Sequence, residues 1–119
     1  MIAAMPSPGD IRIVTRTSTG TTVTVPAGRV FCGEIAISGS VSVAGTGTPR
    51  VTCNGGGTGV EPAAGTIIHQ VVVSGLLSIV GNNSERIEII IRAGDADATL
   101  DFNTGGAGTA SCTVSGFLL

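Results

Sequence analysis

Glycine-rich turns interrupt this chain at short intervals, and their spacing is what most limits its fold. Between the turns lie short runs in which Val, Ile and Thr alternate with other residues, for example 10–16 (DIRIVTR), 21–25 (TTVTV) and 85–92 (ERIEIIIR). Such runs are typical of β-strands, because β-branched side chains pack well on a pleated sheet. Helix signals are nearly absent, so the sequence predicts an all-β fold.

The density of turns predicts a single-domain β-sandwich, jelly-roll-like. We expect about eight to ten short antiparallel strands, since turn signals recur roughly every eight to twelve residues. An immunoglobulin-like sandwich is the alternative, weakened because the chain has no tryptophan for its core. At 119 residues the chain has the size of one domain. We expect an extended N-terminal arm at residues 1–9 and the sandwich at residues 10–119.

Three local patterns make specific predictions. The segment 29–44 (RVFCGEIAISGSVSVA) contains internal glycines, which mark bends, and predicts either two strands or one bent strand. The run 66–73 (TIIHQVVV) is apolar on both faces and predicts a strand that is covered on both sides. The sequence 81–84 (GNNS) predicts a turn.

The chain carries few of the side chains that enzymes use. It has no lysine, tryptophan or tyrosine and a single histidine, and only 12% of its residues are charged. His69 is the one candidate general base, but no G-x-S-x-G nucleophile elbow accompanies it. We expect His69 to be packed in the fold or at an interface. No catalytic residue and no enzyme activity are predicted.

Two loops resemble ligand sites only in part. Of the clustered acids Asp95, Asp97 and Asp101, only the first two match ligand positions of a calcium loop, and the segment lacks the central glycine and terminal glutamate of such a loop. The segment 54–59 (NGGGTG) lacks the lysine of a phosphate-binding loop. We therefore expect solvated turn acids and a plain loop, with no bound metal and no cofactor.

The three cysteines, Cys32, Cys53 and Cys112, include no C-x-x-C pair for zinc. We expect buried reduced thiols, with one disulfide and one free thiol as the alternative. The six arginines form no basic run, so no nucleic-acid partner is expected. No apolar stretch approaches the ~20 residues of a membrane span, and no export signal is present, so we expect folding in the cytoplasm.

Sparse charge combined with 42% hydrophobic residues predicts a surface that packs against other polypeptides. The terminal segments are apolar, and so is the run 66–73. We expect these parts of the chain to bind partners. The candidate partner-binding residues are Met1, Ile2, Met5, Pro6, Pro8, Ile67, His69, Val71, Phe117, Leu118 and Leu119.

The run 22–31 (TVTVPAGRVF) and the glycine-rich alternating segment that follows it to residue 45 resemble small structural proteins of tailed bacteriophages, particularly those of actinobacteria. The likeness is to capsid decoration, or head cement, proteins. It implies a β-rich virion subunit, often a homotrimer, that sits on the capsid surface and clamps neighbouring copies of the major capsid protein. It implies no catalytic residues. The alternatives are a phage tail or baseplate component and a host-surface binding module.

Overall fold

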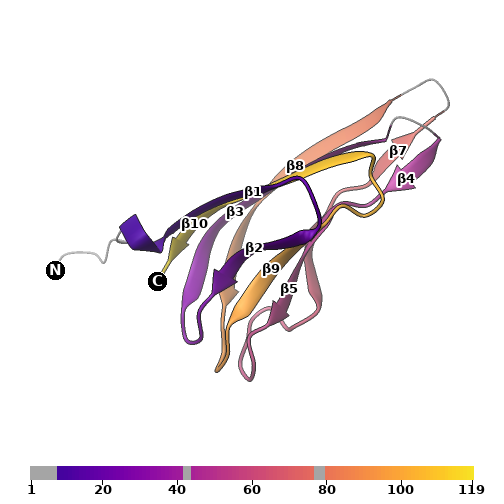
Figure 1. Ribbon diagram of the computed structural model, residues 1–119. Coiled ribbons are helices and arrows are strands. Elements are labelled where there is room, and N and C mark those ends of the chain that lie inside the picture. The colour runs from indigo at the N-terminus through magenta and orange to yellow at the C-terminus, as the bar shows by residue number, and fades with distance from the viewer. Residues whose placement is uncertain (1–7, 42–43, 77–79) are drawn as a thin grey trace.

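The computed structural model describes residues 8–41, 44–76 and 80–119 (Figure 1). After a single 3-10 turn at Pro8–Asp10 (η1), these residues form ten strands, all paired antiparallel. The prediction of an all-β sandwich is confirmed. Residues 1–7, most of the expected arm, lie outside the described part of the chain.

Two four-stranded sheets form the sandwich, and a two-stranded ribbon lies at one end of it (Figure 1). Sheet A has the order β1 (Ile11–Arg16), β10 (Thr109–Leu118), β3 (Val30–Val41), β8 (Gly81–Arg92). Sheet B has the order β2 (Gly20–Val25), β9 (Ala98–Asn103), β5 (Arg50–Gly55), β6 (Thr66–Gln70). The ribbon pairs β4 (Gly45–Gly47) with β7 (Val73–Gly75).

The strand order is that of a jelly roll. Apart from the β5–β6 hairpin, successive strands of the two main sheets lie in opposite sheets, and the first strand, β1, pairs with the last, β10. Such crossing connections wrap the chain around a single core. The jelly-roll prediction is therefore met in topology as well as in strand count.

The core lies between the two sheets and is built from alternate residues of each strand. Phe31 and Ile35 of sheet A and Leu100 and Phe102 of sheet B are at most 1% exposed. No polar or charged side chain among the described residues is buried there. Aliphatic and aromatic burial, worth about 1.5–3 kcal/mol for a fully buried large side chain, therefore carries the fold.

The long segments differ in part from their predictions. Within the segment 29–44, Val30–Val41 form the single strand β3 and not two strands, and residues 42–43 lie outside the described part of the chain. The prediction of a turn at 81–84 is wrong, because these residues begin β8 and continue its pairing with β3 as far as Gly81 opposite Val41. Their polar side chains suit this exposed stretch of an edge strand, and the ladder with β3 outweighs the local turn preference.

The prediction that 66–73 is covered on both sides is also wrong. Only Thr66–Gln70 forms a strand of sheet B, and it is the edge strand β6. Ile67 on that strand is 50% exposed. The apolar residues of this segment do not share one environment. Val71 and Val73 are buried in the core, whereas Val72 is exposed.

One arginine holds the two ends of the described chain together. The Arg29 Nε atom donates a hydrogen bond of 2.8 Å to the Leu119 carbonyl oxygen. Its Nη2 atom lies 3.1 Å from Asp10 Oδ1. The start of β1 and the end of β10 are thereby fixed side by side.

A pair of glycines lets a buried aromatic ring lie against sheet A. Gly33 and Gly116 face each other across the β3–β10 ladder. A Cβ at Gly33 would lie 2.1 Å from the Ser115 carbonyl oxygen, and one at Gly116 would lie 2.2 Å from that of Cys32. Either Cβ would also lie within 3.0 Å of the Phe31 ring, so no larger residue fits at these two positions.

Replacing either glycine should destabilise the fold by overpacking. We expect Gly116→Ala and Gly33→Ala each to lower the free energy of unfolding by about 1–3 kcal/mol. Urea denaturation followed by circular dichroism measures the change. Gly108→Ala is the control, because its Cβ would have its nearest neighbour, the Ser40 carbonyl oxygen, at an ordinary 3.5 Å. Equal effects at Gly108 and Gly116 would contradict the packing argument.

Candidate functional site

A row of apolar side chains crosses the outer face of sheet A. Ile11 lies opposite Phe117 in the β1–β10 register. Phe117 lies opposite Cys32, which in turn lies opposite Ile90. Alternate residues of a strand face opposite sides, and the neighbours Phe31 and Ile91 are buried, so these four side chains point outward. We call Ile11, Phe117, Cys32 and Ile90 the apolar row.

The row is exposed as well as apolar. Ile90 is 67% exposed and Ile11 is 49% exposed, while Phe117 and Cys32 are half-buried. Ile13, two residues after Ile11 on the same face, is 72% exposed. Single exposed aliphatic residues are common on protein surfaces, but a contiguous band across every strand of a sheet is typical of an interaction site.

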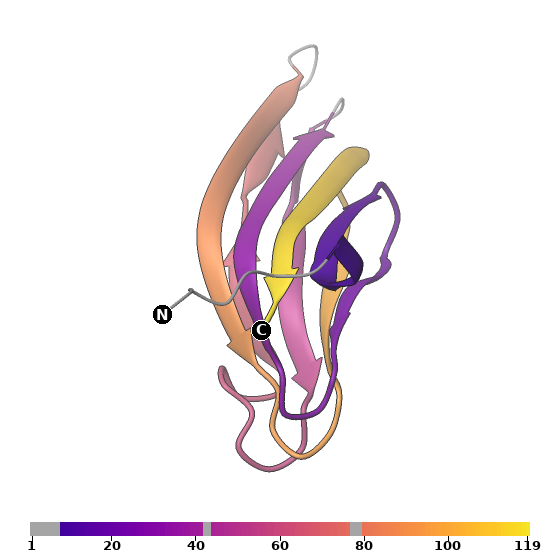
Figure 2. The same cartoon turned by 90° about the vertical axis from the view of Figure 1, so that its left-hand side faces the viewer.

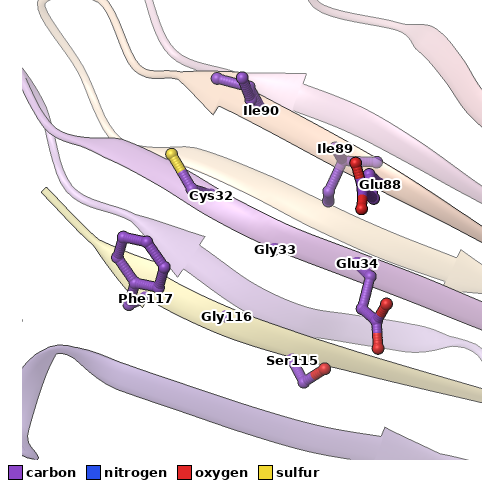
Figure 3. Close-up of a pocket in the computed structure, with 9 residues that line it drawn as sticks. All are labelled: Cys32, Gly33, Glu34, Glu88, Ile89, Ile90, Ser115, Gly116 and Phe117. Carbon is purple, nitrogen blue, oxygen red and sulfur yellow. The ribbon is translucent and has the colours of Figure 1, made fainter.

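Two carboxylates border the row. Glu34 and Glu88 lie directly opposite each other in the β3–β8 register, in a second line beside the apolar row that also contains Ser115 (Figure 3). The Arg86 Nη1 atom lies 3.5 Å from Glu34 Oε1. No cation is paired with Glu88 among the described residues. Like charges directly across a ladder are unfavourable, so this edge of the row favours a cation.

Three residues of the row, Phe117, Cys32 and Ile90, line one open depression on the sheet surface together with the two carboxylates. Figure 3 shows Phe117, Cys32 and Ile90 in one diagonal line, with Ser115, Glu34 and Glu88 in the next. The backbone of Gly33 and Gly116, between these two lines, also lines the depression. The arrangement presents an apolar strip with an acidic border, which suits contact with another protein surface.

The predicted partner-binding residues are divided by the fold. Phe117 lies in the apolar row, and Leu119, 52% exposed, follows it at the same end of sheet A. Ile67 is exposed on the edge of sheet B, away from the row. Val71 and Leu118 are at most 2% exposed and serve the core instead of the surface. Met1, Ile2, Met5 and Pro6 lie outside the described residues, and Pro8 begins η1.

Sequence reasoning did not single out Ile11, Ile13, Cys32 or Ile90 as surface residues. The alternation in 10–16 places the isoleucines on one face of the strand, but nothing in the pattern says which face is buried. Ile90 lies within three consecutive isoleucines that occupy both faces of β8. Only the register of sheet A brings these residues together.

His69 lies at one side of the sandwich, where the two edge strands β6 and β8 approach each other. Its Nε2 atom is 3.2 Å from Glu85 Oε1, and its side chain is 18% exposed. The Nε2 atom has no hydrogen-bond partner among the described residues. The contact brings a side chain of sheet B against one of sheet A, in keeping with the packed histidine that the sequence predicts.

The acids of the 95–101 segment form hydrogen bonds with the protein itself. Asp95 Oδ1 accepts a hydrogen bond from the Thr58 amide at 2.8 Å, and Asp97 Oδ1 accepts one from the Ala27 amide at 2.9 Å. These bonds join three turns at one end of the sandwich. Within the described residues, no cluster of His, Cys, Asp and Glu side chains could hold a metal ion.

Asp101 is the centre of a polar network on the outer face of sheet B. Thr21 donates to its Oδ1 atom at 2.7 Å, and Asn54 and Thr99 donate to its Oδ2 atom at 2.6 and 3.1 Å. Burial alone raises the pKa of Asp101, but the three hydrogen bonds outweigh burial and hold the pKa below its ordinary value. The outer faces of the two sheets thus differ: one carries an apolar row and the other a hydrogen-bonded polar surface.

The cysteines are all free, and their environments differ. Burial raises the pKa of Cys112 to about 12. Burial also raises the pKa of Cys53, and the Asp101 carboxylate adds to that rise. Cys32 is the only one of the three that is not buried, because it lies in the apolar row.

Comparisons with known proteins name no relative. No protein-family model, no curated protein and no solved structure matches the chain. Among the described residues, no helix is long and apolar enough to cross a membrane.

The exposure of the apolar row can be checked with a thiol reagent. We expect a maleimide or a disulfide reagent to modify Cys32 alone in the native protein, and all three cysteines in urea. Burial and a raised pKa keep the thiolate fraction of Cys112 low. Mass spectrometry of digested protein identifies the modified residue. Modification of Cys112 before Cys32 in the native state would contradict the described packing.

The stability of the protein should depend on pH through Asp101. Because its pKa is lowered on folding, Asp101 contributes stability above its unfolded value of 3.8, and this contribution is lost as the pH falls through the folded pKa. We expect Asp101→Asn to lower the free energy of unfolding at pH 7 by about 1–3 kcal/mol, with a difference that shrinks below pH 4. Urea titrations across pH measure it. The exposed Glu61→Gln is the control, and a difference that does not vary with pH would refute the assignment.

Proposed function

We propose that the protein is a non-enzymatic structural subunit of a bacteriophage virion. In this proposal it binds the outer surface of the capsid and stabilises contacts between major capsid subunits. The apolar row on sheet A is the observation that carries the docking part of the proposal. The assignment to a capsid rests on the resemblance of residues 22–31 and the following segment to head decoration proteins.

The difference between the two sheets supports one orientation on a shell. The apolar row of sheet A would face the capsid. The outer face of sheet B, with its network around Asp101, would face solvent, because its polar groups are already hydrogen-bonded to one another. A subunit that docks through sheet A therefore buries its exposed apolar side chains and leaves a polar outer surface.

The chemistry of the row indicates what the partner surface offers. Apolar side chains would pack against Phe117 and Ile90, and a basic residue would lie near Glu88, which has no cationic partner within the described residues. Opposite charges at the rim of an interface add orientation and speed of association more than affinity. The acidic border would thus fix the direction in which the subunit sits.

The size of the row predicts weak binding of one copy and strong binding of many. Fully burying a large aliphatic side chain contributes about 1.5–3 kcal/mol. Association itself costs roughly 4–15 kcal/mol or more in lost freedom of motion, so four such residues leave little net affinity. Linked copies on an ordered shell would gain avidity without any new contact. This favours assembled shells over isolated capsid subunits.

Placing a charge in the middle of the row should disrupt shell binding and spare the fold. We expect Cys32→Arg to weaken co-sedimentation with expanded shells of the encoding phage by at least about tenfold, which corresponds to roughly 1.4 kcal/mol. Glu34 and Glu88 lie beside position 32 and accommodate the added positive charge. The matched control is Thr24→Arg on the outer face of sheet B, an exposed position that should leave binding unchanged.

Three outcomes would count against the proposal. The first is that the unmodified protein does not bind shells. The second is that Thr24→Arg loses binding as severely as Cys32→Arg. The third is that the unmodified protein binds purified tails in preference to shells. The last result would assign the row to a tail component. Circular dichroism of each variant separates a loss of binding from a loss of fold.

A further inference from the structure

Sheet A ends in an open edge at β8. Arg92 exchanges both of its backbone hydrogen bonds with Glu61, at 2.8 and 2.9 Å, on the side away from β3. Since the backbone groups of successive strand residues point to opposite sides, those of Ile90, Glu88 and Arg86 point to the same side as those of Arg92. No described strand pairs with β8 there. Within the described residues, no strand partner therefore satisfies the outward N–H and C=O groups of Ile90, Glu88 and Arg86.

The opposite edge of sheet A, at β1, is open in the same way. Val30 of β3 and Leu119 exchange both backbone hydrogen bonds, so odd-numbered residues of β10 bond to β3 and even-numbered ones bond to β1. In the pair Arg12–Gly116, an even-numbered residue of β1 is the partner. The odd-numbered residues of β1, beginning with Ile11, therefore direct their backbone groups to the open edge.

The two edges are complementary in their backbone pattern and in their faces. Each edge directs backbone groups away from the sheet on the residues whose side chains point to the outer face of sheet A. At the β1 edge, the Ile11 carbonyl oxygen also accepts a hydrogen bond of 3.1 Å from Arg12 Nη1, and its second lone pair can still accept one from a strand partner. β1 also runs antiparallel to β8 within the sheet, because three antiparallel pairings separate them. The residues in question are Ile11, Ile13 and Thr15 on β1 and Arg86, Glu88 and Ile90 on β8.

We propose that β1 of one copy of this chain pairs antiparallel with β8 of a second copy, with Ile11 opposite Ile90. Sheet A then continues from one subunit into the next. Figure 2 shows that the η1 end of β1 and the strand β8 lie on opposite sides of the sheet, with β3 and β10 between them. Each subunit can therefore offer one edge to each of two neighbours.

The lengths of the two open edges agree with this register. β1 has six residues, and they would pair with residues 85–90 of β8. Beyond Ile90, the edge of β8 is already occupied at Arg92, which pairs with Glu61. β1 does not compete for that position, because it begins at Ile11 and the residues just before it form η1. At the other end, β1 stops before it would reach Ser84, whose N–H already donates to Asn83 Oδ1 at 2.9 Å.

The side chains that meet in this register are compatible. Ile11 and Ile90 are the two exposed ends of the apolar row, so the row would become continuous across the subunit boundary. On the other face, Arg16 would lie opposite Glu85, a pair of opposite charges. The contact uses two different edges, so it is heterologous and generates a ring if the rotation closes.

A charge swap across the boundary tests the pairing. We expect the unmodified chain to associate in sedimentation velocity, and Ile11→Glu and Ile90→Lys each to raise the dissociation constant by roughly tenfold or more. The double variant should recover to within a few-fold, because the carboxylate introduced at position 11 of one copy would meet the ammonium group introduced at position 90 of the next. Within one subunit, positions 11 and 90 lie three strand spacings apart, about 14 Å, so the rescue cannot be internal. Ile67→Lys on β6 is the control and should leave association unchanged.

Hydrogen exchange gives a second test on the unmodified chain. The amide protons of Ile11, Ile13, Glu88 and Ile90 should become more protected as the protein concentration rises, whereas that of Thr24 should not. A chain that stays monomeric, a double variant no better than its parents, or dissociation by Ile67→Lys would overturn the inference. The strand pairing does not depend on the capsid assignment. Shell binding by a monomeric chain would refute the strand pairing and leave the proposed function standing. An oligomer that does not bind shells would refute only the proposed function.

Discussion

The antiparallel register of sheet A is the constraint on which the rest of the molecule depends. A shift of one residue in any of its three ladders would turn every side chain of that strand to the opposite face. Phe31 and Ile35 would then leave the core, and Cys32 would enter it. The paired glycines Gly33 and Gly116 are tied to this register, because only a position that faces another glycine can bring the Phe31 ring and two backbones so close together. The same alignment creates the apolar row.

Much of the fold could be predicted from the sequence, because strand alternation and glycine turns are local signals. The jelly-roll class follows from them, and so do the two alternatives for 29–44, two strands or one bent strand, between which the local signals do not decide. The start of β8 at Gly81 could not be predicted, because its pairing with β3 is a long-range contact that competes with a good local turn sequence. The edge position of β6 could not be predicted either, because an apolar run does not reveal whether other parts of the chain cover both of its faces.

The candidate site was less predictable than the fold. Phe117 was singled out from the sequence because it ends an apolar terminus, but its partners in the row come from three other strands. Alternation in β1 shows that Ile11 and Ile13 share a face without showing that the face is exposed. Leu118 illustrates the same limit, since it is adjacent to Phe117 and yet points into the core. Surface or core depends on register, and register is decided by the sheet as a whole.

The contacts of Arg29 with Asp10 and Leu119 bear on where a further peptide can be attached to the chain. Because Asp10 and the Leu119 carbonyl bind the same guanidinium, the polypeptide enters and leaves the sandwich at one place, beside the apolar row. A peptide joined after residue 119 would therefore begin next to that surface. A reporter or affinity tag that must not obstruct it belongs in the glycine turn at 104–108, which is separated from both ends by the whole length of β10.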